Sequence, residues 1–408
     1  MNIHLLDGKD VTSRESAYRL IERTMGFPDW FGHNLDALAD SLSELDPDED
    51  AVVFVNTGAL KTRLGPYAGK TSVMMALTKS GPERRAPAAM ISNDLGSGVT
   101  LADHRFAALS GARAAEITDE CICFCHDVLT ARLREFFDAG CELVLSDIPG
   151  FGVGALEHVY HGLTREGLDG FALAPFTVVT EPRRAALLRD GDRGDLTVIL
   201  RAQLMEADLI VLNKCDLIGA DEAEALAAYL AGAFPEARIL RVSAVTGEGL
   251  DALADALYGG TASLRHPAID YGGAALQGAM GKLSEFYLQY RAEVCCDDFD
   301  GTAYLSDLAV RAREGFRAAG AEIPHLKLLA WTPEGDFGKV DLLGAALAPE
   351  ITRPFAGRCT DVAVVLNASA VCPAKALDRI LSEAAEAVSK DYQLELMIFR
   401  RDCFGMGG

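Results

Sequence analysis

The chain has 408 residues, of which 50% are hydrophobic, and its formal net charge is −22. A chain of this length can bury large cores, so we expect two or three domains. The negative charge argues against a nucleic-acid partner, because binding a phosphate backbone requires lysine and arginine. No apolar run reaches the roughly 18 residues that cross a bilayer, and the start MNIHLLDGKD lacks the regions of a signal peptide. Ten cysteines then suggest free thiols or metal ligands in a cytoplasmic protein.

Residues 1–45 predict a short strand followed by two amphipathic helices around a Gly-Phe-Pro turn. The stretch FPDWFGHNLDALADSL (27–42) resembles the barstar family of ribonuclease inhibitors, and a strand and helix expected within 51–77 extend the resemblance to about residue 80. This implies a small α/β module at residues 1–62, or to about residue 80. It also implies that Trp30, Phe31, Asp36 and Asp40 form a surface of this chain that binds the basic active site of a nuclease.

Asp36 and Asp40 are four residues apart, so they share a helix face and form a local acidic patch. The patch is either a binding surface for a basic protein or a solvated helix face in a very acidic chain. We favour the solvated face over nuclease inhibition, because a reused fold need not retain its partner.

A candidate phosphate loop runs from Gly65 through Gly69, Lys70 and Thr71 to Ser72. Such a loop cradles phosphate with backbone N–H groups at a helix N-terminus, and its lysine and threonine serve the phosphates and Mg²⁺. The spacing G-x-x-x-G-K-T is one residue shorter than usual, and the preceding strand AVVFVN ends nearly ten residues too early. The alternative is that residues 64–77 form only the third helix of the barstar-like module.

The run C-x-C-x-C-H places Cys121, Cys123, Cys125 and His126 within six residues. Thiolate and imidazole ligands at this density suit Zn²⁺ or another thiophilic divalent metal. In extended backbone the three cysteines would share one face, because side chains alternate along a strand. The alternative is a buried strand of small hydrophobic residues.

Three later elements each follow an apolar strand. The strand CELVLSDIPG ends in Asp147 and Gly150, the usual positions of a carboxylate near Mg²⁺ and a glycine near the γ-phosphate. The segment IVLNKCDL carries Asn213 and Lys214, which would hold the loop, and Asp216, which would accept hydrogen bonds from guanine N1–H and N2–H₂. The segment VSAVTGEG adds a loop that packs beside guanine, with Ser243 and Ala244. Together these elements predict a GTPase-type fold.

Residues 64–258 resemble the CobW/HypB/UreG family of metallocentre GTPases. The resemblance rests on GKTS, the N-D-x-G of Asn93 to Gly96, ECIC, the Asp147 strand, NKCD and SAVTGEG. The chain departs from the family at two places. The family's cysteine element is Gly-Cys-x-Cys-Cys, whereas here Glu120 replaces the glycine and Phe124 stands at the position of the third cysteine. The family also usually has Glu at the position of Asp147. Members help to load metals or metal-containing cofactors into target proteins under the control of GTP.

The resemblance implies specific roles for the matching residues. Gly69, Lys70 and Thr71 would hold phosphates and Mg²⁺, with Asp147 supporting Mg²⁺ or the attacking water. The three cysteines would hold the cargo metal, and the implied client is a metalloprotein or a corrinoid-type protein.

The C-terminal third predicts an α+β sandwich of ferredoxin-like type. We expect helices at 273–290, 306–320 and 373–390 with strands between them, and HLKLLA resembles the C-terminal domain of CobW-like proteins. The expected domains are therefore a barstar-like module at 1–62, a P-loop GTPase-like parallel-sheet domain at 63–260 and an α+β domain at 270–408. The favoured function is a GTP-hydrolysing metallochaperone that uses GTP/GDP, Mg²⁺ and Zn²⁺ or a similar metal. The alternative is a degenerate GTPase scaffold that binds a basic protein through its barstar-like surface.

Overall fold

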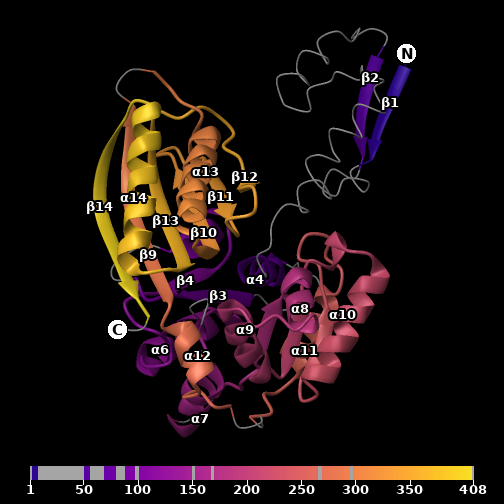
Figure 1. The fold of residues 1–408 in the computed structure, drawn as a ribbon. Coiled ribbons are helices and arrows are strands. Elements are labelled where there is room, and N and C mark those ends of the chain that lie inside the picture. Colours follow the sequence, from indigo (N-terminus) through magenta and orange to yellow (C-terminus); the bar gives the residue numbers. More distant parts are fainter. Residues whose placement is uncertain are drawn as a thin grey trace. The chain divides into compact units, whose positions relative to one another are not determined.

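The computed structural model describes residues 2–7, 50–55, 69–79, 88–96, 101–148, 152–166, 170–264, 269–294 and 297–406. The chain divides into two units, Met1–Gly65 and Pro66–Gly408. In the first unit, strands β1 (Asn2–Asp7) and β2 (Asp50–Val55) pair in parallel (Figure 1). The four residues predicted to bind a partner lie outside the described residues: Trp30, Phe31, Asp36 and Asp40.

The second unit begins with two parallel sheets of three strands each. The first has the order β4-β3-β5, with β3 at Ala88–Asn93, β4 at Ala114–Ile117 and β5 at Leu143–Ser146. The second has the order β6-β7-β8, with β6 at Thr177–Thr180, β7 at Leu209–Leu212 and β8 at Arg238–Arg241. The central strands β3 and β7 are buried at every position, as expected where helices cover both faces of a parallel sheet.

Helices alternate with these strands along the chain. They are α4 (Lys70–Lys79), α5 (Ala102–Leu109), α6 (His126–Asp138), a π-helical turn (Leu156–Tyr160) leading into α7 (His161–Glu166), α8 (Pro182–Arg189), α9 (Asp195–Met205), α10 (Ala220–Ala233) and α11 (Leu250–Gly259). Helix α4 buries Val73 and Leu77 in one core cluster with Val211 of β7 and Leu253 of α11. Residues 70–79 are therefore packed as a helix of the parallel-sheet region.

A six-stranded antiparallel sheet follows the short helix α12 (Ala274–Met280), with the strand order β12-β11-β10-β13-β9-β14. Its elements are β9 (Leu283–Val294), α13 (Gly301–Ala319), β10 (Glu322–Trp331), β11 (Phe337–Leu342), β12 (Glu350–Arg353), β13 (Asp361–Val371), α14 (Ala374–Asp391) and β14 (Leu394–Gly405). Without the hairpin β11–β12, the chain order is β-α-β-β-α-β, the ferredoxin-like arrangement. The predicted fold class, parallel α/β followed by α+β, is confirmed.

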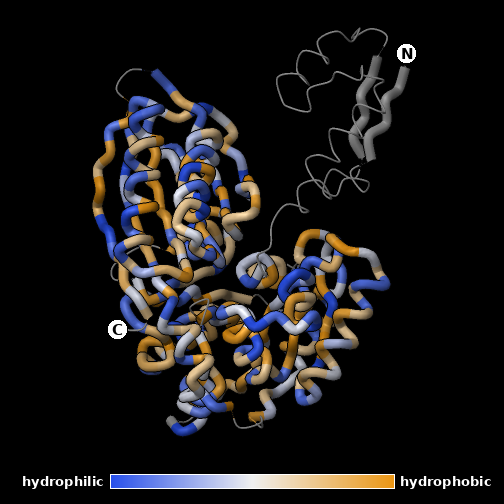
Figure 2. The backbone as a smooth tube through the Cα atoms, in the orientation of Figure 1, coloured by the Kyte–Doolittle hydropathy of each residue, from blue (hydrophilic) through white to orange (hydrophobic). Residues whose placement is uncertain are grey.

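The two faces of this antiparallel sheet have different neighbours. Tyr290 of β9 points to the face covered by α13 and α14 and joins the largest core cluster, whereas Tyr287 packs with Leu101 at the start of α5. Along the helices, hydrophilic and hydrophobic positions alternate, as amphipathic packing requires (Figure 2). None of the described helices is long and apolar enough to cross a membrane.

The prediction of a helix at 273–290 is wrong beyond its first turns. The helix ends at Met280, Gly281 follows, and β9 starts at Leu283. Both faces of β9 are covered over residues 283–288, so this first half of the strand, where the helix was predicted, shows none of the alternation that identifies a half-exposed strand. Its aromatic residues favour extended backbone.

Candidate functional site

Three of the predicted nucleotide-binding segments meet around Asn213. Gly69 has a φ of +78°, and a Cβ atom at this position would lie 2.5 Å from Asn213 Nδ2. Residues other than glycine rarely adopt this backbone conformation, and there is no space for a side chain. Asn213 is 1% exposed, and its Oδ1 accepts the backbone N–H of Ala244 at 3.1 Å. One buried amide therefore touches both the residue before α4 and the loop after β8.

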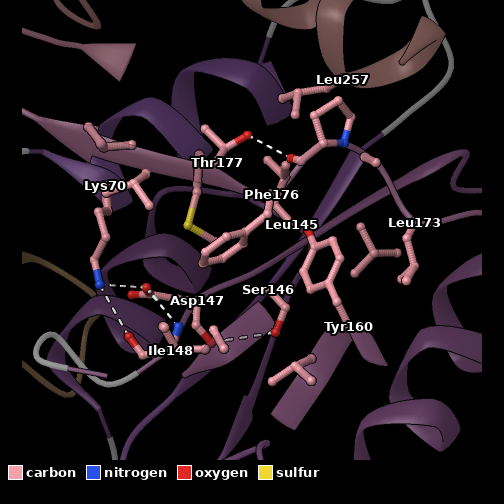
Figure 3. Close-up of a pocket in the computed structure, with 18 of the residues that line it drawn as sticks. Lys70, Leu145, Ser146, Asp147, Ile148, Tyr160, Leu173, Phe176, Thr177 and Leu257 are labelled. Carbon is pink, nitrogen blue, oxygen red and sulfur yellow. Dashed lines mark hydrogen bonds and ion pairs between the residues drawn. The ribbon is translucent and has the colours of Figure 1, made fainter. Parts of the chain in front are cut away.

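Lys70 and Asp147 form the charged end of this site. Lys70 Nζ lies 2.7 Å from Asp147 Oδ1 and also donates to the backbone oxygen of Ile148 at 3.2 Å (Figure 3). The Asp147 N–H donates to the carbonyl of Ile91 at 2.8 Å, which fixes the carboxylate just past the end of β5 and beside β3. Both side chains are mostly buried, with 25% and 16% exposure. Such a pair can separate to hold an anion at the lysine and a cation at the carboxylate.

Thr71 hydrogen-bonds to Asp103 of α5. Burial alone would raise the pKa of the Asp103 carboxyl, but Lys327, Lys339 and the Thr71 hydroxyl together lower it below its ordinary value. Asp103 is therefore ionised at neutral pH. Sequence analysis missed this residue, because it lies in no motif and its partners come from three separate elements.

The predicted guanine-binding residues lie on two loops that are bonded to each other. Lys214 is in the left-handed region, with a φ of 63°, and Asp216 follows in the 3₁₀ turn Cys215–Leu217. The N–H of Cys215 donates to the carbonyl of Val242 at 3.2 Å. Ser243 is fully buried, and its Oγ accepts the N–H of Thr246 at 3.1 Å. The segments NKCD and SAVTGEG thus form one rigid edge after β7 and β8.

A cavity of about 280 Å³ extends from Lys70 and Asp147 between strands β5 and β6. Every residue of 142–148, which contain β5, and of 171–179, which contain β6, lines the cavity. The cavity therefore lies between the edges of these two strands and not against the face of one sheet. In Figure 3, Tyr160, Leu145 and Phe176 surround it, while Lys70 lies at its polar end. In the described part of the chain, no strand pairs with either facing edge or leads directly into Gly69. Among the described residues, the phosphate end thus has no neighbouring strand of the kind that usually supports such a loop.

The cysteine run forms a turn and the start of a helix, so the shared face expected for an extended backbone does not occur. The N–H of Cys123 donates to Cys121 Sγ at 3.4 Å, and the thiol of Cys125, the residue before α6, donates to the carbonyl of Cys121 at 3.4 Å. The side chain of Cys123 is the main cause that lowers the pKa of the Cys121 thiol, and the backbone N–H of Cys123 adds to it. Among the residues that the structure describes, no three His, Cys, Asp or Glu side chains are grouped to hold a metal ion. The cysteine turn (residues 121–125) thus joins two thiols and keeps the third apart.

Asn93 ties this cysteine turn to the end of β3. Its Nδ2 donates to the carbonyls of Ile117 and Glu120 at 3.0 and 2.9 Å, and its Oδ1 accepts the N–H of Ile122 at 3.0 Å. Sequence analysis placed Asn93 only in the N-D-x-G element. Its contacts connect the cysteine turn directly to the end of β3, just before Asp94.

Comparison with known families identifies two regions. Residues 60–241 match the family described as CobW/HypB/UreG, nucleotide-binding domain, and residues 1–86 match Barstar (barnase inhibitor). No curated protein matches the chain.

Solved structures similar to the chain include two HypB proteins and a GTPase. The hydrogenase maturation factor HypB from Archaeoglobus fulgidus is 21% identical, with a TM-score of 0.33, and the match covers 47% of this chain and 84% of that one. HypB from Helicobacter pylori in complex with nickel is 16% identical, with a TM-score of 0.33 and coverage of 47% and 81%. The Zn(II)-bound YjiA GTPase from E. coli is 12% identical, with a TM-score of 0.30 and coverage of 79% and 95%.

The match over residues 60–241 includes the Gly69 turn, the Asp147 strand end and the NKCD loop, which the structure brings to one site. The chain thus matches the CobW/HypB/UreG nucleotide-binding domain over residues 60–241 and the barstar family over residues 1–86.

Proposed function

We propose that this protein binds and hydrolyses GTP and uses that cycle to deliver a metal or a metal-containing cofactor. The observation that carries the proposal is the pair Lys70–Asp147, with its 2.7 Å contact, next to the Gly69–Asn213 approach. A lysine at the start of α4 can bind phosphate oxygens together with backbone N–H groups of that helix. Under this proposal, phosphate binding draws Lys70 away from Asp147.

Each remaining residue then has a role in the same site. Mg²⁺, when bound, supplies positive charge near the transferred phosphate. Thr71 and Asp147 would hold it, because hydroxyl and carboxylate oxygens are its preferred ligands. Asp147 would also orient the attacking water. Asn213 and Lys214 hold the guanine loop, Asp216 accepts from the base, and the Ser243–Ala244 loop packs beside it.

Isothermal titration of the full chain with GTP and with ATP, each with Mg²⁺, tests this proposal directly. We expect GTP and GDP to bind at least about 100-fold more tightly than ATP, because adenine offers no donor pair for a carboxylate at Asp216. Equal heats for GTP and ATP, or no heat with either, would contradict nucleotide recognition by this site.

We propose that Cys121, Cys123 and Cys125 hold the cargo metal, Zn²⁺ or a similar thiophilic ion, after the cysteine turn rearranges. The thiolate is the metal ligand, and the pKa of the Cys121 thiol is lowered. The Cys121 side chain raises the pKa of Cys123, and burial raises that of Cys125, so a metal would have to displace the protons of both thiols. The three bonds of Asn93 give the nucleotide site a route to this turn. The client would be a cytoplasmic metalloprotein or a corrinoid-type protein, and the three domains would span 1–62, 63–260 and 270–408.

Changing Cys121, Cys123 and Cys125 to serine should abolish the binding of one Zn²⁺ per chain. Wild-type affinity should fall as the pH drops toward 6, because thiols must lose protons to bind metal. Zn²⁺ titration with a chromophoric chelator measures both effects. A matched control is Cys359→Ser, at a buried cysteine of the C-terminal sheet region. Unchanged stoichiometry in the triple variant would show that these cysteines are structural.

A second function has its own support. The cavity between β5 and β6 leaves the phosphate end without a neighbouring strand among the described residues, as in a GTPase scaffold that has lost activity. Such a scaffold would act as a binding module, with Asp36 and Asp40 facing a basic protein. This alternative predicts a folded chain with no measurable nucleotide heat.

A further inference from the structure

The C-terminal sheet sends charged side chains to the phosphate end of the candidate site. A cavity of about 20 Å³, room for about one water, is lined by Lys70 and Asp147 together with Asp94, Asp103 and Lys327. Lys327 belongs to β10, and its Nζ lies 2.5 Å from Asp103 Oδ2. The two side chains are only 13% and 11% exposed. A second lysine thus lies beside the same small cavity as Lys70.

A buried hydroxyl without a hydrogen-bond partner lines the same cavity. Ser92 of β3 is 4% exposed, and its Oγ has no hydrogen-bond partner among the described residues. A buried polar group without a hydrogen-bond partner destabilises the folded chain, so its retention calls for an explanation. A polar ligand atom or a water in this cavity would satisfy it. The unpaired Ser92 hydroxyl thus indicates a ligand in this cavity independently of the charged side chains that line it.

The pairing of Lys327 differs from that of the other buried lysine in the sheet. Lys339 of β11 pairs with Asp341, two residues along the same strand, at 2.7 Å from Oδ1. Lys327 instead reaches an aspartate 224 residues away in sequence, on helix α5, which also bonds to Thr71. Lys339 acts on Asp103 only through its charge and pairs directly with Asp341, whereas Lys327 contacts Asp103 itself.

We propose that Lys327 binds the terminal phosphate of a nucleoside triphosphate and so lets this protein distinguish GTP from GDP. The proposal rests on the proposed nucleotide binding and assigns the C-terminal sheet a part in it. On GTP binding, Lys327 exchanges Asp103 for phosphate oxygens. Asp103 keeps its hydrogen bond from Thr71, and Mg²⁺ bound at Thr71 would supply positive charge near the Asp103 carboxylate in place of Lys327. GDP lacks the terminal phosphate that would draw Lys327 away from Asp103.

The test measures dissociation constants of GTP and GDP for the full-length wild type, Lys327→Met and the control Lys339→Met. Losing one charge-assisted contact of about 1.5–3 kcal/mol should weaken GTP binding by about 10- to 100-fold. GDP affinity should stay within about twofold, because no contact to a diphosphate is lost. Lys339→Met should leave the ratio of GTP to GDP affinity unchanged, although it also removes a buried lysine.

Asp103→Asn keeps the test decisive if Lys327→Met unfolds. This variant releases Lys327 from its carboxylate, and any effect on Mg²⁺ applies to both nucleotides, so the ratio of GTP to GDP affinity should stay equal or rise. If Asp103→Asn lowers this ratio as Lys327→Met does, the pair is purely structural and the inference fails. An unchanged ratio of GTP to GDP affinity in Lys327→Met also overturns it, while leaving nucleotide binding intact. Wild-type protein that binds neither nucleotide overturns both proposals.

Discussion

Replacing Lys70 with alanine should weaken GTP binding about 100-fold, or about 2.7 kcal/mol, while the chain stays folded. The side chain would contribute a charge-assisted contact to phosphate, and alanine removes it without disturbing the helix, because alanine has the highest helix propensity. The ion pair with Asp147 is lost as well, but both groups keep some contact with solvent. We therefore expect a small loss of stability and a large loss of affinity. Calorimetry and thermal unfolding on the same samples separate the two.

Lys282→Ala is the matched control for this change. Lys282 also pairs with an aspartate, at 2.9 Å from Asp195 Oδ1, but it is an exposed residue before β9, away from the site. Exposed pairs contribute about 0–1 kcal/mol, so this variant should keep wild-type GTP affinity. If Lys70→Ala and Lys282→Ala bind GTP equally well, α4 is a packing helix only, and the phosphate-loop assignment is wrong.

The family and most of the fold could be predicted from sequence because their signals are local. An apolar run followed by Asn213-Lys-Cys-Asp216 contains both the strand and its functional loop, and parallel strands bring such ends to one edge. The same locality explains the error at β9. The first six residues of β9, which are all buried, carry no periodic pattern, so strand and helix cannot be told apart there until the partner strands are known.

The residues that sequence analysis missed depend on contacts between distant segments. Asp103 gains its role from Thr71 and from Lys327, which is 224 residues away. The cysteine turn is set by Asn93, whose amide satisfies three backbone groups around it. The regular spacing of the cysteines does not indicate a turn, because the same spacing also fits a strand with alternating side chains. Tertiary hydrogen bonds, and not local propensity, decide both features.

Asp216→Ala should remove guanine selectivity and cost about 2–4 kcal/mol of GTP binding. The carboxylate would accept two hydrogen bonds from the base, and its loss leaves both donors unpaired in a closed loop. The cost to stability should be small, because Asp216 is partly exposed in a short 3₁₀ turn. Asp221→Ala, an exposed aspartate in the first turn of α10, is the control and should bind GTP as wild type does.

Asp216→Asn gives a sharper test, because it changes the hydrogen-bonding pattern instead of deleting it. An amide offers one acceptor and one donor group where the carboxylate offers two acceptors. The variant should therefore lose GTP and gain xanthosine triphosphate, whose base carries N1–H beside a C2 carbonyl. Competition between the two nucleotides, measured on wild type and variant, should reverse in order. If both proteins prefer GTP to the same degree, Asp216 does not contact the base, and guanine recognition must be assigned elsewhere in the chain.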